Sequence, residues 1–397
     1  MKNQPYIQYL PDPGLVIRAG RAFVGWSTRT FAALTAWAFT GSLGCRQAYD
    51  PPAVSSPNAY LVVEGFINSG PDSTYFTLSH TFNLSDTAVV SPELHAQVTV
   101  QGKDNSTYTL AEIGNGKYGA PLQGLNPAVQ YRLDIRTIAG KEYASDFVAM
   151  KVSPPIDSVN WTQNNQGVQL YVNTHDPQGN SRYYRWNYQE VWEFHSAYFA
   201  TSAYVNGQIV SFTPDTMYTC WQSDVSANIL LGSSAKLAQD QIQFMPLVMI
   251  PTADQRISVL YSILVTQYVL TPDAYAWWQS MQKNTEQIGS IFSVEPSTTG
   301  GNIHNVSDST ELVVGYVSAG TIATQRIYIS ASQVAPWYYQ NGCTEINKPL
   351  DSALMYLAGG YDWIDVYYDP GLRVHLALKT CVDCTQTGSN HKPSFWP

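Results

Sequence analysis

Cysteines are the residues of this chain whose placement most clearly indicates covalent chemistry. Cys45 directly follows the uncharged run TFAALTAWAFTGSLG, and three arginines precede that run at residues 18 to 29. A basic segment, an apolar segment and a small residue before a cysteine are typical of a lipoprotein signal peptide. We therefore expect residues 1–44 to be removed. Acyl chains on Cys45 would be the only cofactor, and residues 45–57 would tether the protein to a bacterial membrane.

Two features of this segment leave an alternative open. Ser42 and Leu43 stand in the reverse of the usual order before a lipidated cysteine, and the basic segment before the apolar run is long. The alternative is an ordinary secretory signal, with Cys45 as an incidental thiol. A membrane-spanning anchor is disfavoured, because the apolar run is shorter than the ~20 residues that cross a bilayer.

Four further cysteines, Cys220, Cys343, Cys381 and Cys384, predict disulfide bonds. An even number of cysteines in an exported protein favours pairing, and four cysteines allow three connectivities. We expect Cys343 to pair with Cys381 or Cys384, and Cys220 to pair with the other, which would tie the C-terminal tail to the body. A redox-active pair is disfavoured because a loop-like run, TQTGSNHKP, follows Cys384. A zinc site is disfavoured because two of the cysteines are isolated in the sequence.

Sequence motifs of enzymes are sparse. None of the seven histidines falls in a His-Glu-x-x-His motif, and the sequence has no Gly-x-Ser-x-Gly elbow. Ser233 and Lys236 have the Ser-x-x-Lys spacing that can place a lysine beside a nucleophilic serine, but the companion motifs are missing. We therefore expect no enzymatic activity and no catalytic residues.

Two groups of carboxylates have spacings that invite comparison with known sites. Glu190 and Glu193 could act as a pair in glycoside hydrolysis, which depends on a separation that only the fold sets. Asp362, Asp365 and Asp369 could bind calcium, but their spacing is not that of an EF-hand loop. Solvated loop side chains are the simpler interpretation of the aspartates, and we expect no metal site.

The composition favours an exported, β-rich protein. The formal net charge is −9, and the segment before Cys45 holds four basic residues and one acidic residue, so the remainder is more acidic still. Nucleic acid is therefore not an expected partner. Only 13% of the residues are charged, whereas the 27 tyrosines and 11 tryptophans suit pleated sheets and interfaces.

The elements that would position these residues are mostly strands. Val129, Tyr131, Leu133 and Ile135 alternate with polar residues, which is typical of a half-buried antiparallel strand. The AQVTV and STYTL runs, separated by a short polar turn, predict a hairpin. Several such short runs together predict an immunoglobulin-like or fibronectin-like sandwich over residues 58–150.

A larger β-rich domain with a disulfide-tied tail is expected over residues 151–397. Pro154 and Pro155 cannot donate to a sheet ladder, which suits a domain boundary. The aromatic run RYYRWNYQEVWEF follows, and we expect its rings to pack in a core; the alternative is an exposed surface for a glycan or a protein. Further along, ELVVGYVS and TQRIYIS predict a hairpin around Ala319 and Gly320.

One prominent helix is predicted over residues 271–288. Thr271 suits the N-cap, a proline follows it at the first helical position, and Gly289 suits the C-terminal end. Apolar residues recur at helical spacing, including Trp277 and Trp278. We expect these tryptophans to pack on a sheet and not to stack on a ligand.

Three long runs resemble a known family. They are SVLYSILVTQYVLTPDAYAWWQSMQKNTEQIGSIFSVEPSTTGGNIHNV, ELVVGYVSAGTIATQRIYI and the ending CVDCTQTGSNHKPSFWP. These runs resemble blocks of a Bacteroidota lipoprotein family that is classified as domain of unknown function 4249. The similarity spans nearly the whole chain after Cys45.

The resemblance implies an outer-membrane lipoprotein, often encoded beside TonB-dependent transporters, and it supplies no catalytic residues. We therefore expect a non-enzymatic, lipid-anchored outer-membrane accessory protein. Its partner would be a TonB-dependent (starch-utilisation-type) transporter, which it would serve in nutrient capture, gating or complex stability. The alternative is a stand-alone surface lipoprotein that binds a glycan or a peptide. The leaflet stays open, because only one acidic residue, Asp50, closely follows Cys45.

Overall fold

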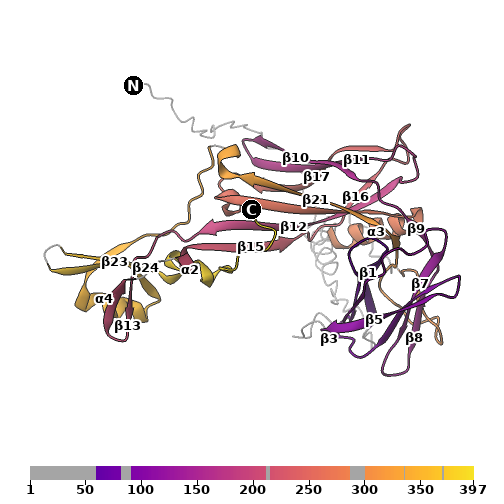
Figure 1. Ribbon diagram of the computed structural model, residues 1–397, viewed down its shortest axis with the longest axis horizontal. Helices are drawn as coiled ribbons and strands as arrows, with labels where there is room; N and C mark the ends of the chain where they lie inside the picture. Colours follow the sequence, from indigo (N-terminus) through magenta and orange to yellow (C-terminus); the bar gives the residue numbers. More distant parts are fainter. Residues whose placement is uncertain (1–59, 82–90, 212–214, 287–299, 335, 369–370) are drawn as a thin grey trace, which may run out of the picture. The chain divides into compact units, whose positions relative to one another are not determined.

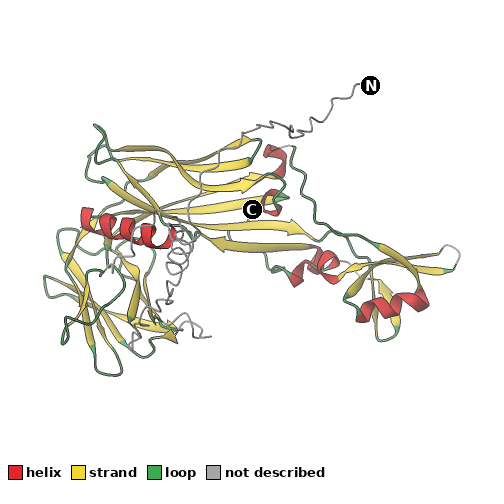
Figure 2. Ribbon diagram, turned by 180° about the vertical axis from the view of Figure 1, so that it is seen from behind, coloured by secondary structure: helices red, strands yellow, loops and turns green. Residues whose placement is uncertain are grey.

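The computed structural model describes residues 60–81, 91–211, 215–286, 300–334, 336–368 and 371–397. The described chain is mainly β-sheet with a few helices, which confirms the expected fold class at that level (Figures 1 and 2). The predicted lipidation site Cys45, the signal segment, the tether and the predicted helix end at Gly289 lie outside the described residues.

The N-terminal part forms one large sheet in which eight strands close into a barrel-like ring. The pairings run β7-β4-β5-β6-β2-β1-β20-β9 and return to β7. Strand β5 allows the closure, because it pairs with β4 through its first half and with β6 through its second half. The strands of this sheet are β1 (Leu61–Asn68), β2 (Thr74–His80), β3 (Ser91–Pro92), β4 (Gln97–Gly102), β5 (Thr107–Gly114), β6 (Lys117–Ala120), β7 (Gln130–Arg136), β8 (Glu142–Ser145), β9 (Val148–Lys151), β19 (Ile303–Asn305) and β20 (Ala319–Gly320).

The apolar side chains of these strands form the core of the ring. Tyr131, Leu133 and Ile135 of β7 are buried, as their alternation predicts, and they share one cluster with Phe76 and Leu78 of β2. The hairpin predicted from AQVTV and STYTL is confirmed as the β4–β5 pair. Local alternation and turn signals therefore predicted these strands correctly.

The middle of the chain forms two sheets that share one core. Their strand orders are β10-β11-β17 and β15-β12-β18-β21, with β16 also paired to β12. Leu170 of one sheet and Tyr184 and Trp186 of the other are fully buried in the same cluster, which confirms core packing for these two rings of the aromatic run. The elements are β10 (Ile156–Asn164), β11 (Gly167–His175), β12 (Tyr183–His195), β15 (Thr219–Val225), β16 (Leu230–Ser233), β17 (Gln241–Pro251), η1 (Gln255–Ile257), β18 (Leu260–Val269), β21 (Ile322–Ser330) and η2 (Ala331–Val334).

Residues 300–320 join the N-terminal sheet, although the sequence placed them in the C-terminal domain. Strand β20 lies parallel to β1 and β9, and Val314 bridges Val62 of β1. The hairpin predicted around Ala319 and Gly320 is wrong. The backbone before β20 bonds to β1, whereas β21 pairs with β18 in a different sheet, so the chain crosses between sheets at this point.

Glu311 ties this late segment to the N-terminal sheet. Its carboxylate accepts hydrogen bonds from Lys141 Nζ at 2.9 Å, from the Tyr143 hydroxyl at 2.8 Å and from Asn305 Nδ2 at 2.7 Å. Burial raises the pKa of Glu311, but the hydrogen bonds outweigh it, so the pKa lies below its ordinary value. The ionised carboxylate therefore stabilises the fold at neutral pH, and this contribution is lost as the pH falls through the folded-state pKa.

Replacing Glu311 with glutamine is expected to lower the free energy of unfolding at neutral pH by about 1–3 kcal/mol, because bonds to a charged, largely buried group are lost. Chemical denaturation over a pH series measures the effect. The deficit should shrink toward acid pH, where the wild-type carboxylate is also protonated. Glu142→Gln, which breaks the more exposed pair with Arg136, is the control and should change stability by less than about 1 kcal/mol. A Glu311→Gln deficit that stays constant with pH would contradict this role.

The C-terminal part is built from a three-stranded sheet, β22-β24-β23, and a short hairpin, β13-β14. Trp363 and Leu376 of the sheet are buried, and Trp363 stacks on Tyr204 of the hairpin with ring centres 5.3 Å apart. The elements are β13 (Ser202–Val205), β14 (Gln208–Ser211), α2 (Asp215–Tyr218), β22 (Ile346–Pro349), α4 (Leu350–Ala358), β23 (Tyr361–Tyr368), β24 (Leu372–Leu378), α5 (Lys379–Val382) and η3 (Cys384–Gln386).

The predicted long helix is α3 (Pro272–Glu286), and its start is as expected. Thr271 Oγ1 accepts a hydrogen bond from the Ala274 N–H at 3.2 Å, which is the N-cap interaction that the sequence predicts. Ala274 is the buried residue of the helix. Within the described ranges, no helix is both long and apolar enough to span a membrane.

Candidate functional site

A cavity of about 730 Å³ is the candidate functional site. Its lining comes from β1, β2 and β6 of the N-terminal sheet, from β12, β18 and β21 of the central sheet, from α3, and from residues 72–73, 226–229 and 314–316. This volume lies in the range of small-molecule pockets. Elements distant in the sequence thus meet around one space.

Aromatic rings form much of the cavity wall. Phe66 of β1 meets Tyr268 of β18 edge to face, with ring centres 5.1 Å apart. On the helix side, the rings of Trp277 and Trp278 are 4.9 Å apart, and Trp277 lies 5.8 Å from Tyr316. Burial raises the pKa of both Tyr268 and Tyr316, as expected for hydroxyls beside an apolar, poorly hydrated wall.

Arg185 places a positive charge in this wall. Its guanidinium carbon lies 4.4 Å from the ring centre of Tyr268 and 4.2 Å from that of Trp278, so the group contacts two aromatic rings. Burial lowers the pKa of Arg185, and the Tyr268 hydroxyl opposes that shift. The neighbouring strand explains the position, because Arg185 of β12 lies directly opposite Tyr268 of β18.

Other polar groups line the cavity on the N-terminal side. Lys117 Nζ lies 4.3 Å from the ring centre of Tyr75, and the exposed Glu64 and Asp72 also border the space. The described residues of the lining include neither a histidine nor a cysteine. Such a set of side chains can hold a ligand by stacking, hydrogen bonding and charge.

Polar contacts hold helix α3 against the loop at residues 226–229 beside the cavity. Gln282 Nε2 donates to the Ile229 carbonyl at 2.6 Å, and the Ile229 N–H donates to Glu286 Oε1 at 2.6 Å. On the other wall, Gly315 has a φ of +146°, and a Cβ there would lie 2.2 Å from the Val63 carbonyl oxygen. Only glycine allows this close approach of the 314–316 segment to β1.

The tryptophans of α3 differ from their sequence-based prediction. Trp277 and Trp278 are half-buried, contact Arg185, Tyr316 and each other, and line the cavity. The sequence assigned them to packing on a sheet alone. Helical spacing identifies the face on which they lie, but not what that face meets.

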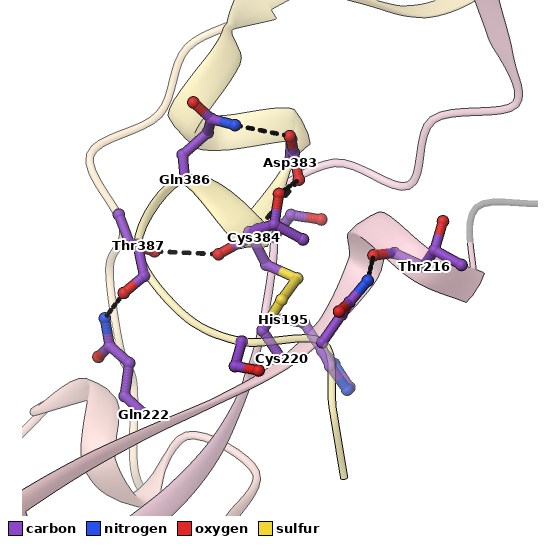
Figure 3. Close-up of a disulfide and its surroundings, with 12 residues drawn as sticks. His195, Thr216, Cys220, Gln222, Asp383, Cys384, Gln386 and Thr387 are labelled. Atoms are coloured by element: carbon purple, nitrogen blue, oxygen red, sulfur yellow. Dashed lines mark hydrogen bonds between the residues drawn. A yellow bond between two sulfur atoms is a disulfide. The ribbon is translucent and has the colours of Figure 1, made fainter. Parts of the chain in front are cut away.

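The four cysteines form two disulfides, Cys220–Cys384 and Cys343–Cys381, which is one of the two connectivities expected among the three that four cysteines allow. Figure 3 shows the first bond joining β15 to the tail, where Gln222 Nε2 also donates to the Thr387 carbonyl at 2.6 Å. Both bonds lie away from the cavity lining. Their role is to hold the C-terminal tail.

The Ser-x-x-Lys spacing does not place a lysine beside a serine nucleophile. Ser234 donates a short hydrogen bond to buried Asp240, and Ser233 donates to the Arg182 carbonyl at 3.1 Å. Lys236 is exposed. The serines therefore serve local structure.

Glu190 and Glu193 do not act as a pair. They lie three residues apart on β12, so their side chains point to opposite faces of the sheet. Buried Glu190 accepts hydrogen bonds from Arg256 and from the Tyr261 hydroxyl, whereas Glu193 accepts one from Trp396 Nε1 at 2.9 Å. Each carboxylate is used to stabilise its own surroundings.

The aspartates near the C-terminus are not brought together as ligands. Asp365 Oδ1 contacts His375 Nδ1 at 2.6 Å, Asp362 accepts from the Trp363 N–H at 2.8 Å, and Asp369 lies outside the described residues. In the part of the chain that the structure describes, no three His, Cys, Asp or Glu side chains are grouped to hold a metal ion.

Sequence reasoning missed the cavity and its central charge. Arg185 lies in RYYRWNYQEVWEF, an aromatic run expected to be core, and a cation inside such a run is a signal that could have marked it. The partners Tyr268 and Trp278 come from other elements, and only the fold brings them to Arg185.

Comparison with known proteins gives one family match. The model of the family described as Domain of unknown function (DUF4249) matches residues 46–326. No curated protein matches the chain. Among solved structures, a chain from the "Complete structure of manganese lipoxygenase of Gaeumannomyces graminis and partial structure of zonadhesin of Komagataella pastoris" is 12% identical, with a TM-score of 0.14, and the match covers 55% of this chain and 91% of that one. A score this low supports no argument about fold or function.

Proposed function

We propose a function from the premise that this chain belongs to the DUF4249 family, whose model matches most of its length. The protein is a non-enzymatic, lipid-anchored outer-membrane protein that captures a small ligand for a TonB-dependent, starch-utilisation-type transporter. The observation that carries the proposal is the aromatic cavity bordered by β1, β12, β18 and α3.

The cavity supports capture more than gating or complex stability alone. Its rings offer large apolar contact areas, and its volume suits one ligand of moderate size. Proton transfer in enzymes is most often performed by histidine or by a carboxylate held against the reacting group. The two carboxylates that border the space are exposed, and this favours binding over catalysis.

The anchor is supported by two independent observations. The segment before Cys45 has the order of a lipoprotein signal, and the family model begins to match at residue 46, directly after that cysteine. A lipid-tethered binding protein raises the effective concentration of its ligand site beside a membrane partner.

The finer fold of the N-terminal part belongs to the same proposal. We propose that residues 58–150 are an immunoglobulin-like or fibronectin-like unit to which the late strands β19 and β20 have been added. Its support is the run of short antiparallel strands from β1 to β8 around one core.

Copurification tests the proposed function. The full chain, tagged at its C-terminus and expressed in its own host, is expected to recover a TonB-dependent transporter in near-equal amounts from detergent-solubilised outer membranes. Cys45→Ala is the matched control, and it should reduce recovery because the tether is lost. Mass spectrometry of the mature N-terminus should find acylated Cys45.

Two results would contradict the proposal in different ways. Repeated failure to recover a transporter would exclude the partnership, and ligand binding without a transporter would favour the alternative, a stand-alone surface protein that binds a glycan or a peptide. An unmodified Cys45 thiol, or cleavage at another position, would exclude the anchor.

A further inference from the structure

Arg185 differs from the other described arginines in its hydrogen bonding. Its buried Nε has no hydrogen-bond partner among the described residues. The other six described arginines each donate to an oxygen acceptor: Arg132 to Gln101, Arg136 to Glu142, Arg182 to backbone carbonyls, Arg256 to Asp254 and Glu190, Arg326 to Ser262, and Arg373 to Asn347.

Arg185 is half-buried, and its guanidinium borders the cavity with its enclosed Nε lacking an oxygen acceptor. The rings of Tyr268 and Trp278 stabilise the guanidinium in part, but rings cannot accept its in-plane N–H groups as an oxygen pair does. Taking a charge out of water without a partner destabilises the fold. The terminal nitrogens of Arg185 are not enclosed in this way, so they are the donors open to an acceptor that a ligand in the cavity supplies.

A second donor borders the same space. Trp277 Nε1 is buried and has no hydrogen-bond partner among the described residues. Unpartnered indole nitrogens also occur at Trp192, Trp221 and Trp363, which do not line the cavity, so this donor adds to the argument but does not carry it. The main evidence is the geometry around Arg185.

The charges on the opposite side limit the number of negative charges on a ligand. Glu64 and Asp72 border the cavity from the N-terminal sheet, and Lys117 is the cation on that side. These two carboxylates would repel a ligand that carries a dianionic group, such as a phosphate monoester, more strongly than a ligand that carries one carboxylate. A planar carboxylate also matches the two parallel donors of a guanidinium.

We infer that the cavity binds its ligand through one carboxylate held by Arg185, with the body of the ligand between the rings of Trp277, Trp278 and Tyr316. This inference rests on the proposed function, because it names the chemical class of the captured ligand. The carboxylate of a peptide end and that of an acidic sugar have the same chemistry at Arg185. The binding experiment distinguishes these two sources.

Calorimetry with matched probes on the purified full chain tests the inference. The probes are N-acetylated Ala-Phe-Ala as free acid and as C-terminal amide, and galacturonic acid and its methyl ester. At least one acid should bind about tenfold or more tightly than its neutral partner. In Arg185→Gln this preference should disappear.

Arg326→Gln is the control variant. Arg326 also stacks on an aromatic ring, 3.7 Å from the centre of Phe395, but it has an acceptor in Ser262 and lies outside the cavity lining. It should keep the acid preference. Arg185→Gln should unfold at a thermal midpoint close to that of wild type, since the enclosed Nε–H that it removes has no hydrogen-bond partner to lose.

The inference would be overturned if neither acid bound more tightly than its neutral partner, or if the preference survived in Arg185→Gln. These outcomes are separate from the copurification result. Acid-selective binding without a recovered transporter would leave the carboxylate site standing and exclude only the partnership. A recovered transporter without acid selectivity would exclude the carboxylate site and leave the partnership standing.

Discussion

Replacing Arg256 with methionine is expected to lower the free energy of unfolding by about 3–5 kcal/mol, because it leaves the carboxylate of Glu190 buried without its cation. Glu190 is 2% exposed. Its Oε1 accepts from Arg256 Nη1 at 3.1 Å and from the Tyr261 hydroxyl at 2.7 Å. Burial lowers the pKa of Arg256, but hydrogen bonds to Asp254 and the charge of Glu190 outweigh it, so the pKa is raised and the charge is held.

Two further variants separate the loss of a buried pair from the loss of packing. The double variant Arg256→Met with Glu190→Leu should recover much of the stability, because no charge is then left unpaired in the core. Arg136→Met removes an ion pair whose side chains are 57% and 35% exposed, and it should change stability by less than about 1 kcal/mol. Urea denaturation measures all three variants. A loss below about 1 kcal/mol for Arg256→Met alone would contradict a structural role for the pair.

Local signals in the sequence predicted individual elements well. Thr271 and the proline after it place the start of α3, because an N-cap side chain and a fixed φ act within one turn. Tyr131, Leu133 and Ile135 place the buried face of β7, because side chains of a strand alternate between two faces. Both signals depend only on near neighbours in the chain.

Pairings between distant segments could not be predicted in the same way. Ala319 and Gly320 look like a turn, yet they form a parallel strand between β1 and β9 and complete the ring. Parallel partners are joined through long connections, so no local turn signal marks them. The N-terminal ring therefore includes β20, which begins 168 residues after β9 ends (Lys151 to Ala319), and a division of the chain by composition does not reveal this.

The candidate site illustrates the same limit at the level of side chains. Arg185, Tyr268 and Trp278 come from two strands and a helix, and of the three the sequence predicted a role only for Trp278, in packing on a sheet. Strand pairing places Arg185 opposite Tyr268, and the position of α3 supplies the second ring. The charge therefore acquires its proposed binding role only once three elements have been packed together.

Removing the Cys220–Cys384 disulfide by replacing both cysteines with alanine is expected to lower the free energy of unfolding by about 2–5 kcal/mol. The bond joins residues 164 positions apart, and both cysteines are fully or almost fully buried. Loop closure of this length restricts the unfolded chain strongly. The tail beyond the bond adds contacts of its own, including the paired backbones of Trp221 and Ser389.

The matched variant removes Cys343–Cys381, which spans 38 positions. It should destabilise the protein less, because the loop-closure contribution grows with the logarithm of the loop length. Chemical denaturation of both variants and of the wild type with and without reductant measures the order. If loss of Cys343–Cys381, which closes the shorter loop, lowered the free energy of unfolding more, chain entropy would not explain the order. Native contacts of the tail around Cys381 would then account for the stabilisation. If neither loss exceeded about 1 kcal/mol, hydrogen bonds such as those of Trp221 with Ser389 and of Trp396 with Glu193 would suffice to hold the tail.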